Sequence, residues 1–389
     1  MLQGACCCRP MGLTVCYIEA NRNSTMNADQ LNVALLGPDI DHKRSLEAML
    51  GGQVKSLVWV PDSLSQSQGK ALGLFGKVRR AIDQLTYTRD PHFVDAVCRR
   101  LDEAGTDVLV AYWGTNPLSD IGAIKRKRPK IKIVLMVLCY PLALTAAGVA
   151  RQHWMMRRAV KWLDGMLYAN PMMARYFEQE VFGAKGRHLA STVVSPCWPA
   201  SYQAAVRPSA AADAPNIIFA GRTDLSHHTV HAADDLRPLM RQILDAGIEL
   251  HHGKSPETSD GHPLRRPFEP LAQAQLIARM ASHDASLIAY NTEVCQRAER
   301  FEFTVPDRLI TSVASGVPIA IPAKGYAGPK SYLSRYPAVF VFESPADLMR
   351  QLQDRARVQA AREAAWEARK LYTAEAQGEA LASFLATLA

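Results

Sequence analysis

Residues 303–322 read FTVPDRLITSVASGVPIAIP and predict a short helix followed by a buried strand. The carboxylate of Asp307 suits a helix start, because it can cap the helix and complements the positive end of its dipole. Ser315–Gly316 is a typical helix end, and Val317–Ile321 is the apolar run expected of a parallel strand. Arg308 falls in the first turn, where its guanidinium could reach an anion bound at the helix N-terminus. An ordinary helix–turn–strand unit is the alternative interpretation.

The same alternation of apolar runs and helix-like patterns extends in both directions. The predicted strands are Asn32–Leu36, Ser56–Trp59, Asp107–Tyr112, Lys132–Leu138, Gly165–Ala169, Asn216–Ala220, Ile248–His251 and Ala285–Ala289. The predicted helices are Ser45–Leu50, Lys70–Leu85, His92–Ala104, Leu144–Leu163, Pro171–Glu180, His231–Ala246 and Leu271–Ala281, with a mostly helical end at Ser344–Leu388. Strands that alternate with helices predict parallel sheets covered by helices on both faces.

The chain has 389 residues, 48% of them hydrophobic, which is enough for two domains of ordinary size. A stretch rich in Ser, Ala and Pro separates two α/β series. We therefore predict an α/β fold of two tandem Rossmann-like domains: a flexible tail at 1–28, an N-terminal domain at 29–200, a linker at 201–215, and a C-terminal domain at 216–389 that includes terminal helices. A ligand is expected in the cleft between the domains, outside the carboxyl ends of the strands.

Residues 131–150 could be mistaken for a membrane span, because they are apolar apart from Lys132. Pro141 divides this run, and Ile133–Leu138 has the length and composition of a buried strand. We favour the strand.

The formal net charge is +8, which indicates an anionic partner. The excess is confined to residues 1–200, which carry 25 Lys and Arg against 16 Asp and Glu. Six basic residues lie in Lys125–Lys132, and Arg151, Trp154, Arg158 and Lys161 share one helical face. Such a surface suits anionic lipid, while a solvated basic face is the alternative.

The eight cysteines are scattered or consecutive, which favours free thiols in a reducing compartment over a disulfide framework. His227, His228 and His231 lack the spacing of a metal site, so we predict no metal. His251–Ser255 lacks the leading glycine of a P-loop.

Four stretches in order resemble the GT-B glycosyltransferases. Phe303–Pro322 is similar to their nucleotide-sugar signature, in which Pro and a basic residue precede a short helix and A-x-G-x-P-V. NIIFAGRTD at 216–224 resembles the first strand of their C-terminal domain, and ASLIAYN at 285–291 the strand before the signature. LNVALLGPDIDHKRSLEAML at 31–50 resembles the opening strand, loop and helix of their N-terminal domain.

The resemblance implies a nucleoside-diphosphate sugar as donor substrate, with no separate cofactor. It places Arg308 on the donor phosphates and Gly221, Arg222 and Gly316 around the diphosphate. Asn291, Thr311 and Ser315 are further candidates for donor binding. Arg222 as an ordinary surface arginine is the alternative interpretation.

The chain departs from the large retaining branch of this fold at two places. Thr311 stands where that branch has its second signature glutamate, and Glu302 is displaced by one position from the first. Cys139-Tyr140-Pro141 replaces a His-Asp pair. The sequence is therefore compatible with either retention or inversion of configuration at the anomeric carbon of the donor sugar.

For an inverting reaction, Asp39, Asp41 or His42 could deprotonate the acceptor hydroxyl. Asp41 could equally cap the following helix. Glu302 is a further catalytic candidate, and Thr115 and Asn116 are candidates on the acceptor side.

The sequence thus predicts a metal-independent hexosyltransferase that uses a lipid-linked or polysaccharide acceptor. We expect it in the cytoplasm, at the inner face of an anionic membrane, without nucleic acid. The alternatives are a nucleotide-sugar epimerase of the same fold and a basic adaptor that binds nucleic acid or membrane without catalysis. The sugar, the base, the acceptor and the oligomeric state stay open.

Overall fold

The computed structural model describes residues 26–61, 75, 78, 91–112, 118–186, 188–206, 214–222, 232–254 and 261–389. Most of the predicted tail at 1–28 and of the predicted helix Lys70–Leu85 lies outside these residues, as do Thr115, Asn116, His227, His228 and His231. Met26 and Ala28 do not belong to a detached tail, since both pack against a buried cluster of the first domain.

The first sheet has six parallel strands in the order β2-β1-β3-β4-β5-β6. The strands are β1 (Asn32–Gly37), β2 (Ser56–Pro61), β3 (Val108–Ala111), β4 (Lys132–Val137), β5 (Gly165–Tyr168) and β6 (Ala190–Val193). In the central strands, Leu35 pairs with Val110 and Val110 with Val134, and all three are fully buried. Helices cover both faces of the sheet. The strands are therefore buried on both sides, which is why they appear in the sequence as continuous apolar runs.

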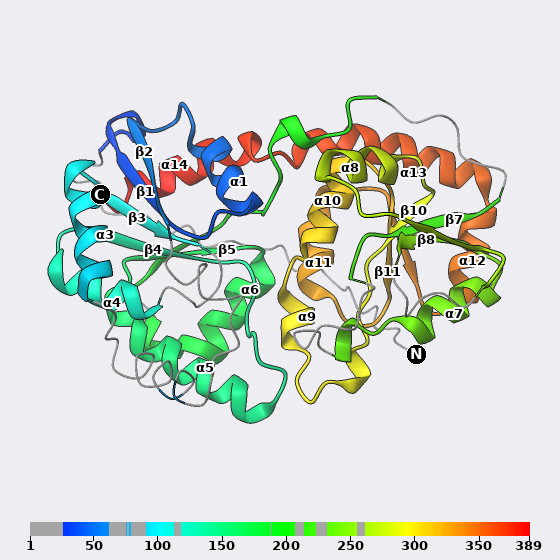
Figure 1. The fold of residues 1–389 in the computed structure, drawn as a ribbon, viewed down its shortest axis with the longest axis horizontal. Coiled ribbons are helices and arrows are strands. Elements are labelled where there is room, and N and C mark those ends of the chain that lie inside the picture. The colour runs from blue at the N-terminus through cyan, green and yellow to red at the C-terminus, as the bar shows by residue number, and fades with distance from the viewer. Residues whose placement is uncertain are drawn as a thin grey trace, which may run out of the picture.

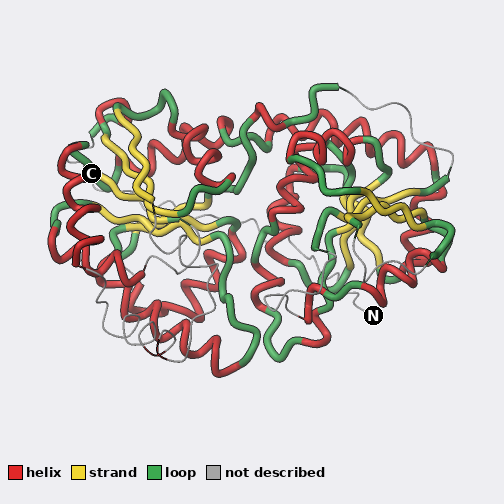
Figure 2. The backbone as a smooth tube through the Cα atoms, viewed as in Figure 1, coloured by secondary structure: helices red, strands yellow, loops and turns green. Residues whose placement is uncertain are grey.

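The second sheet is also parallel and six-stranded, in the order β12-β11-β10-β7-β8-β9. Its strands are β7 (Asn216–Phe219), β8 (Glu249–Gly253), β9 (Arg265–Phe268), β10 (Ala285–Leu287), β11 (Ile319–Pro322) and β12 (Val339–Phe342). The two sheets lie in separate halves of the molecule (Figure 1, Figure 2). The strand order reverses between β1 and β3 in the first sheet and between β7 and β10 in the second, and such switch points are where ligands bind in this class of sheet.

Helices cover both sheets. In the first half they are α1 (Asp41–Leu50), α3 (Pro91–Glu103), α4 (Leu118–Lys127), α5 (Ala146–Ala159) and α6 (Pro171–Tyr176). In the second half they are α7 (Arg237–Asp245), α8 (Gln273–Ala281), α9 (Glu299–Phe303), α10 (Asp307–Ser315), α11 (Ala327–Tyr332), α12 (Pro345–Gln353) and α13 (Arg355–Ala368), followed by α14 (Gly378–Ala386). Several begin at a capping side chain: Asn170 Oδ1 accepts from Met173 N at 2.9 Å, and Ser344 Oγ accepts from Asp347 N at 3.2 Å.

The predicted α/β fold with two Rossmann-like domains is confirmed, and the apolar run at 131–150 is not a span. Its first part is β4 in the middle of a sheet, and α5 begins only at Ala146. Among the described residues, no helix has both the length and the apolar character needed to cross a membrane.

The C-terminal end differs from the domain prediction for 216–389. The helices α13 and α14 run across both halves, and α14 lies beside α1 of the first domain (Figure 1). Leu381 and Leu385 are buried in the same cluster as Met49 of α1. A Cβ on Gly378 would overlap the carbonyl oxygen of Met49, so only glycine permits this approach. The apolar face of α14 therefore completes the N-terminal domain rather than the C-terminal one.

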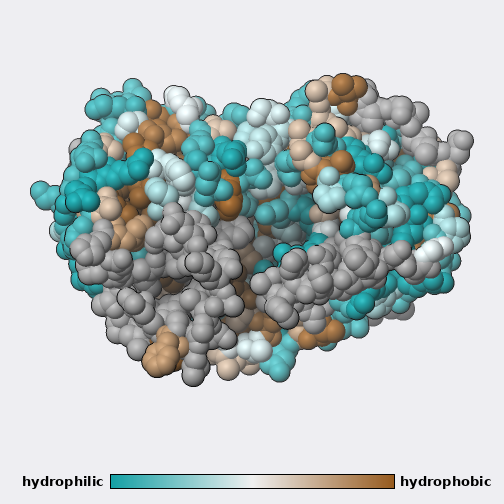
Figure 3. Space-filling model, in the orientation of Figure 1, coloured by the Kyte–Doolittle hydropathy of each residue, from teal (hydrophilic) through white to brown (hydrophobic). Residues whose placement is uncertain are grey.

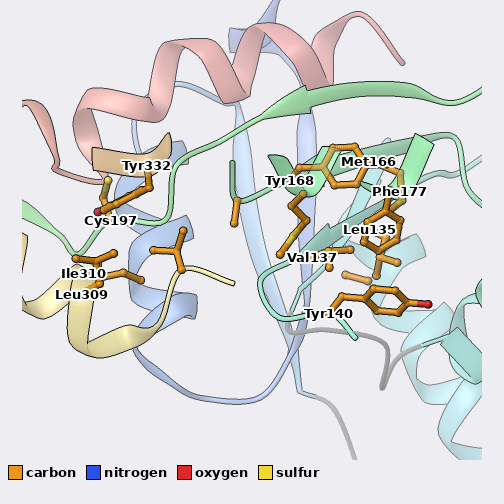
Figure 4. Close-up of a cluster of buried hydrophobic side chains, with 14 of the residues drawn as sticks. Leu135, Val137, Tyr140, Met166, Tyr168, Phe177, Cys197, Leu309, Ile310 and Tyr332 are labelled. Carbon is orange, nitrogen blue, oxygen red and sulfur yellow. The ribbon is translucent and has the colours of Figure 1, made fainter. Parts of the chain in front are cut away.

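A second buried cluster joins the two domains. It contains Leu135 and Tyr140 from the first domain and Leu309 and Tyr332 from the second (Figure 4). Cys197, in the segment that connects the domains, belongs to it as well. Because side chains of both domains are buried in this one cluster, the cluster holds the switch points of the two sheets at a fixed separation.

Candidate functional site

A cavity of about 410 Å³ lies between the two domains, at the carboxyl ends of the strands of both sheets. The molecular surface is hollowed between the two halves (Figure 3). The residues that line the cavity are Pro38, Ile40, Asp41, His42, Trp198, Ala220, Gln273, Leu276, Asp307, Arg308 and Thr311. Pro38 and Ile40 come from the turn between β1 and α1, and Asp41 and His42 from the first turn of α1. Ala220 directly follows β7, so both switch points open onto the same cavity.

Asp41 and His42 are the first two residues of α1, directly after the turn that follows β1. The structure excludes the interpretation of Asp41 as a helix cap: the N-cap of α1 is Ile40, and Asp41 is the first helical residue. Its carboxylate Oδ1 accepts a hydrogen bond from the hydroxyl of Tyr202 at 3.0 Å and from Arg44 Nη1 at 3.3 Å. The carboxylate is thus oriented rather than used as a cap. Asp39 does not line the cavity and pairs with Lys43 at 3.0 Å.

His42 bridges the two domains. Its Nε2 lies 3.0 Å from Oδ1 of Asp307, at the first turn of α10. The side chain of His42 is 5% exposed, whereas that of Asp307 is 60% exposed. The imidazole ring packs against Trp198 with centroids 5.0 Å apart. This arrangement fixes the orientation of the ring and places an imidazole–carboxylate pair on the cavity wall.

Thr311 is held inside a closed set of hydrogen bonds. Its Oγ1 accepts from Trp198 Nε1 at 2.9 Å and from Gln273 Nε2 at 3.1 Å. The same hydroxyl donates to the carbonyl oxygen of Asp307 at 2.9 Å, one turn earlier in α10. Thr311 is 4% exposed, so it ties the interdomain segment and α8 to α10 at the cavity wall.

Arg308 lies across aromatic rings at the start of α10. Its guanidinium carbon is 3.9 Å from the ring centroid of Tyr290 and 5.2 Å from that of Phe219. Nη2 donates to the carbonyl oxygen of Ala289 at 2.6 Å, while Nε is buried without a hydrogen-bond partner. Burial raises the pKa of the Tyr290 phenol, and the adjacent Arg308 charge opposes that rise. The guanidinium of Arg308 is therefore held in one orientation, and it still has N–H groups that can donate to a ligand.

Gly221 is adjacent to this cation. A Cβ at that position would collide with the Phe219 ring and lie 2.6 Å from Arg308 Nη1. The missing side chain is what lets the loop after β7 approach Arg308. Arg222, one residue on, is exposed and is not among the lining residues. The structure therefore brings Gly221 and Arg308 together, as predicted, and leaves Arg222 outside the cavity wall.

Three predicted donor-binding residues do not line the cavity. Ser315 is fully buried, and its hydroxyl donates to the carbonyl oxygen of Ser312 at 2.6 Å. Gly316 is the left-handed C-cap of α10, with φ 71°, and faces Trp366. Asn291 donates its backbone N–H to Ala233. The signature helix thus presents only its first turns to the cavity, because its far end is packed in the core.

Glu302 has a structural role. Its Oε2 accepts from Tyr326 N at 2.9 Å and its Oε1 from Ala327 N at 3.1 Å. Both donors are at the start of α11, where free backbone N–H groups attract a carboxylate. Tyr326 has a positive φ of 62°, a strained conformation that these bonds help to hold. Glu302 does not line the cavity, so the prediction that it is catalytic has no geometric support.

Several lining residues were absent from the sequence prediction. Trp198 comes from the segment that joins the domains, and Gln273 and Leu276 come from α8. Asp307 was interpreted only as a helix-starting residue. Its position directly before Arg308, at the start of the same helix, was the available signal.

The cavity combines a fixed cation, a helix N-terminus, an imidazole and two carboxylates. A helix N-terminus beside an arginine is suited to an anion such as phosphate. An imidazole–carboxylate pair is suited to removing a proton from a hydroxyl group. Within the described ranges, no three His, Cys, Asp or Glu side chains are grouped as metal ligands.

No family model matches the chain, and no curated protein matches it significantly. Solved structures do match over nearly the whole length. A sucrose-phosphate synthase from Thermosynechococcus elongatus aligns with 12% identity and a TM-score of 0.59, covering 91% of this chain and 98% of that one. An α,α-trehalose 6-phosphate synthase from Burkholderia multivorans aligns with 10% identity and a TM-score of 0.61, covering 92% and 98%. A trehalose-6-phosphate structure from E. coli, bound with UDP-2-fluoro glucose, aligns with 8% identity and a TM-score of 0.61, covering 91% and 98%. At these identities the likeness establishes the fold that the chain shares with them.

Proposed function

We propose that this chain, which has the GT-B fold, is a glycosyltransferase that moves a hexosyl group from a nucleoside-diphosphate donor to an acceptor hydroxyl. One observation carries the proposal: a single cavity is lined by the first turn of α10, with Arg308, and by the start of α1, with Asp41 and His42. The α10 part of the lining is the anion-binding wall and the α1 part is the proton-accepting wall, and sugar transfer needs both in one site.

On the donor side, Arg308 and the free N–H groups at the start of α10 hold the diphosphate. As the bond from the anomeric carbon to the phosphate oxygen breaks, its electron pair moves to the diphosphate. The oriented guanidinium stabilises this charge without reorganising. Gly221 allows the ligand and the loop after β7 to approach the same cation. A metal ion is not required, because the arginine and the helix dipole supply the positive charge.

On the acceptor side, His42 or Asp41 takes the proton from the hydroxyl group as its oxygen bonds to the anomeric carbon. Asp307 orients the imidazole of His42 and stabilises the imidazolium that forms. Tyr202 and Arg44 orient the carboxylate of Asp41, because both donate hydrogen bonds to its Oδ1. This chemistry corresponds to an inverting reaction.

The structural neighbours support the proposal at the level of class. Two are a sucrose-phosphate synthase and a trehalose 6-phosphate synthase, and a third is bound with a nucleotide-sugar analogue. The acceptor that we propose is lipid-linked or part of a polysaccharide. The basic N-terminal domain would bring the protein to an anionic membrane surface in the cytoplasm.

A donor panel tests the proposal. The full chain is titrated calorimetrically with common UDP-, GDP- and TDP-sugars, with and without EDTA. We expect one donor to bind in both conditions, and Arg308→Ala to weaken that binding by roughly ten- to a hundredfold while the protein stays folded. Failure of the folded protein to bind any donor would exclude the proposed function. A donor whose sugar is isomerised without an acceptor would instead indicate an epimerase.

A further inference from the structure

The position of Arg308 depends on the segment that follows β10. Its guanidinium rests on the ring of Tyr290, with 3.9 Å from the guanidinium carbon to the ring centroid. Nη2 of Arg308 donates to the carbonyl oxygen of Ala289, the residue directly before Tyr290. The ring of Phe301 also packs on Tyr290, with 4.3 Å between the centroids. Whatever fixes the main chain at Tyr290 therefore fixes the support of the cation.

The phenol of Tyr326 holds that main chain. Its hydroxyl oxygen accepts a hydrogen bond from the N–H of Tyr290 at 2.7 Å and donates one to the carbonyl oxygen of the same residue at 3.3 Å. Burial raises the pKa of Tyr326 to about 12, so the phenol keeps the proton that the second bond requires. Tyr326 is 5% exposed. One buried side chain thus bonds to both main-chain polar groups of Tyr290.

The backbone of Tyr326 is strained. Among the described residues, it is the one non-glycine position with a left-handed backbone, at φ 62°. Such a conformation is costly for a bulky residue, and it persists where the surrounding contacts hold it. The contacts come from Glu302, whose carboxylate accepts from the N–H groups of Tyr326 at 2.9 Å and Ala327 at 3.1 Å. Hydrogen bonds to a charged carboxylate are among the stronger ones in proteins.

These contacts run through three helices on the side of the second half that faces the first (Figure 1). Glu302 lies in α9, Tyr326 directly precedes α11, and Arg308 lies in the first turn of α10. The helices α9 and α11 also contact each other. Of the residues in this series, Arg308 lines the cavity, whereas Glu302, Tyr326 and Tyr290 do not. The series therefore supports the cation from behind the cavity wall.

We propose that Tyr326 is a positioning residue for Arg308, and that Glu302 acts through Tyr326. The phenol fixes the Tyr290 ring on which the guanidinium rests, so the cation is held at the cavity wall before a ligand binds. A bound diphosphate then does not have to immobilise the arginine side chain, which would otherwise reduce its affinity several-fold. The inference rests on the proposed function, because it explains how the donor-binding residue is oriented.

Tyr326→Phe tests the inference, because it removes the hydroxyl group and keeps the ring. The donor Kd of the full chain should rise roughly two- to tenfold, since the guanidinium keeps its charge but loses its fixed orientation. The acceptor KM should stay unchanged.

Glu302→Gln tests the earlier step. It should raise the donor Kd by a smaller factor than Tyr326→Phe does, because the amide oxygen of glutamine can still accept one of the two hydrogen bonds. A fall in kcat with an unchanged donor Kd would make Glu302 a catalytic residue and would overturn the inference.

Tyr336→Phe is the matched control. Tyr336 is buried in the same domain, and its hydroxyl group donates to the carbonyl oxygen of Val317 at 2.8 Å, outside the series from Glu302 to Arg308. Both Phe variants lose a buried phenol, so thermal unfolding should show a loss of stability in each. The donor Kd of Tyr336→Phe should equal that of the unaltered protein. An equal rise in both variants would reveal a general loss of stability and overturn the inference.

A second measurement does not depend on a donor. The Nε–H group of Arg308 is buried, and its NMR resonance, identified by its absence in Arg308→Ala, reports the ring current of Tyr290. In Tyr326→Phe this resonance should move toward that of an exposed arginine, and in Tyr336→Phe it should stay. An unchanged resonance in Tyr326→Phe would overturn the inference, whatever the protein binds. If the resonance moves but the unaltered protein binds no nucleotide sugar, the proposed function fails and the positioning of Arg308 stands.

Discussion

The Nε2 atom of His42 lies 3.0 Å from Oδ1 of Asp307, although the two residues belong to different domains and are 265 positions apart. His42 is nearly buried at the start of α1, and Asp307 is largely exposed at the start of α10. One hydrogen bond thus links the proton-accepting wall of the cavity to the anion-binding wall. The pair orients the imidazole for proton transfer, and it joins the two domains at the cavity. These two effects can be measured separately.

Substitution of His42 by glutamine should lower kcat by about a hundredfold to ten-thousandfold, because a general base contributes on this order. The donor Kd should change little, since His42 faces the acceptor side. The measurement is steady-state kinetics beside calorimetric titration of the donor.

Asp41→Asn and Asp39→Asn are the comparisons. Asp41 lines the same cavity, whereas Asp39 does not. A larger loss of kcat in Asp41→Asn than in His42→Gln would assign the proton transfer to the carboxylate. A large loss in Asp39→Asn would show that the cavity is not the reaction site.

Arg308→Ala should weaken donor binding by roughly ten- to a hundredfold, the range for a lost charge-assisted hydrogen bond. Arg308→Lys keeps the charge but not the planar fork that rests on Tyr290, so it should recover only part of the affinity. Donor titration and thermal unfolding are measured together. Arg222→Ala is the control, because Arg222 is exposed and lies off the cavity wall; a greater loss there would transfer the phosphate contact to Arg222.

The sequence predicted the central strands of both sheets and the edge strand β2, and missed the edge strands β6, β9 and β12. Central parallel strands are apolar on both sides, as in Val33–Leu36, and such runs stand out. The edge strands β6 and β9 are half-exposed, with the sequences ASTV and RRPF, and have no apolar run to detect. The return of α14 to the first domain depends on packing between distant segments, which no local pattern records.

The site could be predicted where a residue directly follows a strand or opens a helix. Asp41, His42 and Arg308 satisfy that condition, and all three line the cavity. Ser315 lies seven residues beyond Arg308, which is about 10 Å along the helix and inside the core. Trp198 reaches the cavity from the segment between the domains, where no motif or period marks it. Its contribution follows only from how the domains pack.

Acid should destabilise the fold through His283. Burial lowers the pKa of His283 from 6.5 to about 3, and the ring packs 4.4 Å from His251, whose pKa burial also lowers. Between pH 6.5 and pH 3 the unfolded chain therefore binds a proton at His283 that the folded protein does not. Stability is unaffected by this group above pH 6.5 and falls below it, by about 1.4 kcal/mol per pH unit.

Urea unfolding at a series of pH values measures this slope. His283→Gln removes the titrating group, so its stability should vary less steeply with pH, whatever its absolute value. The groups that face His283 and remain in the variant are His251 and Arg279. An identical slope in both proteins would place the acid sensitivity elsewhere.

The last helix should stabilise the first domain, not the second. Leu385 of α14 is fully buried in the cluster that contains Leu35 and Met49, so Leu385→Ala should cost about 2–5 kcal/mol of unfolding free energy. Leu371 is 43% exposed, and Leu371→Ala serves as the control with a cost of about 0.5 kcal/mol or less. Hydrogen exchange locates the effect: in Leu385→Ala, amide protection should fall in α1 and β1 more than in β10 and β11. Loss of protection confined to the second sheet would contradict the docking of α14 on α1, and would return residues 378–386 to the domain in which the sequence alone had placed them.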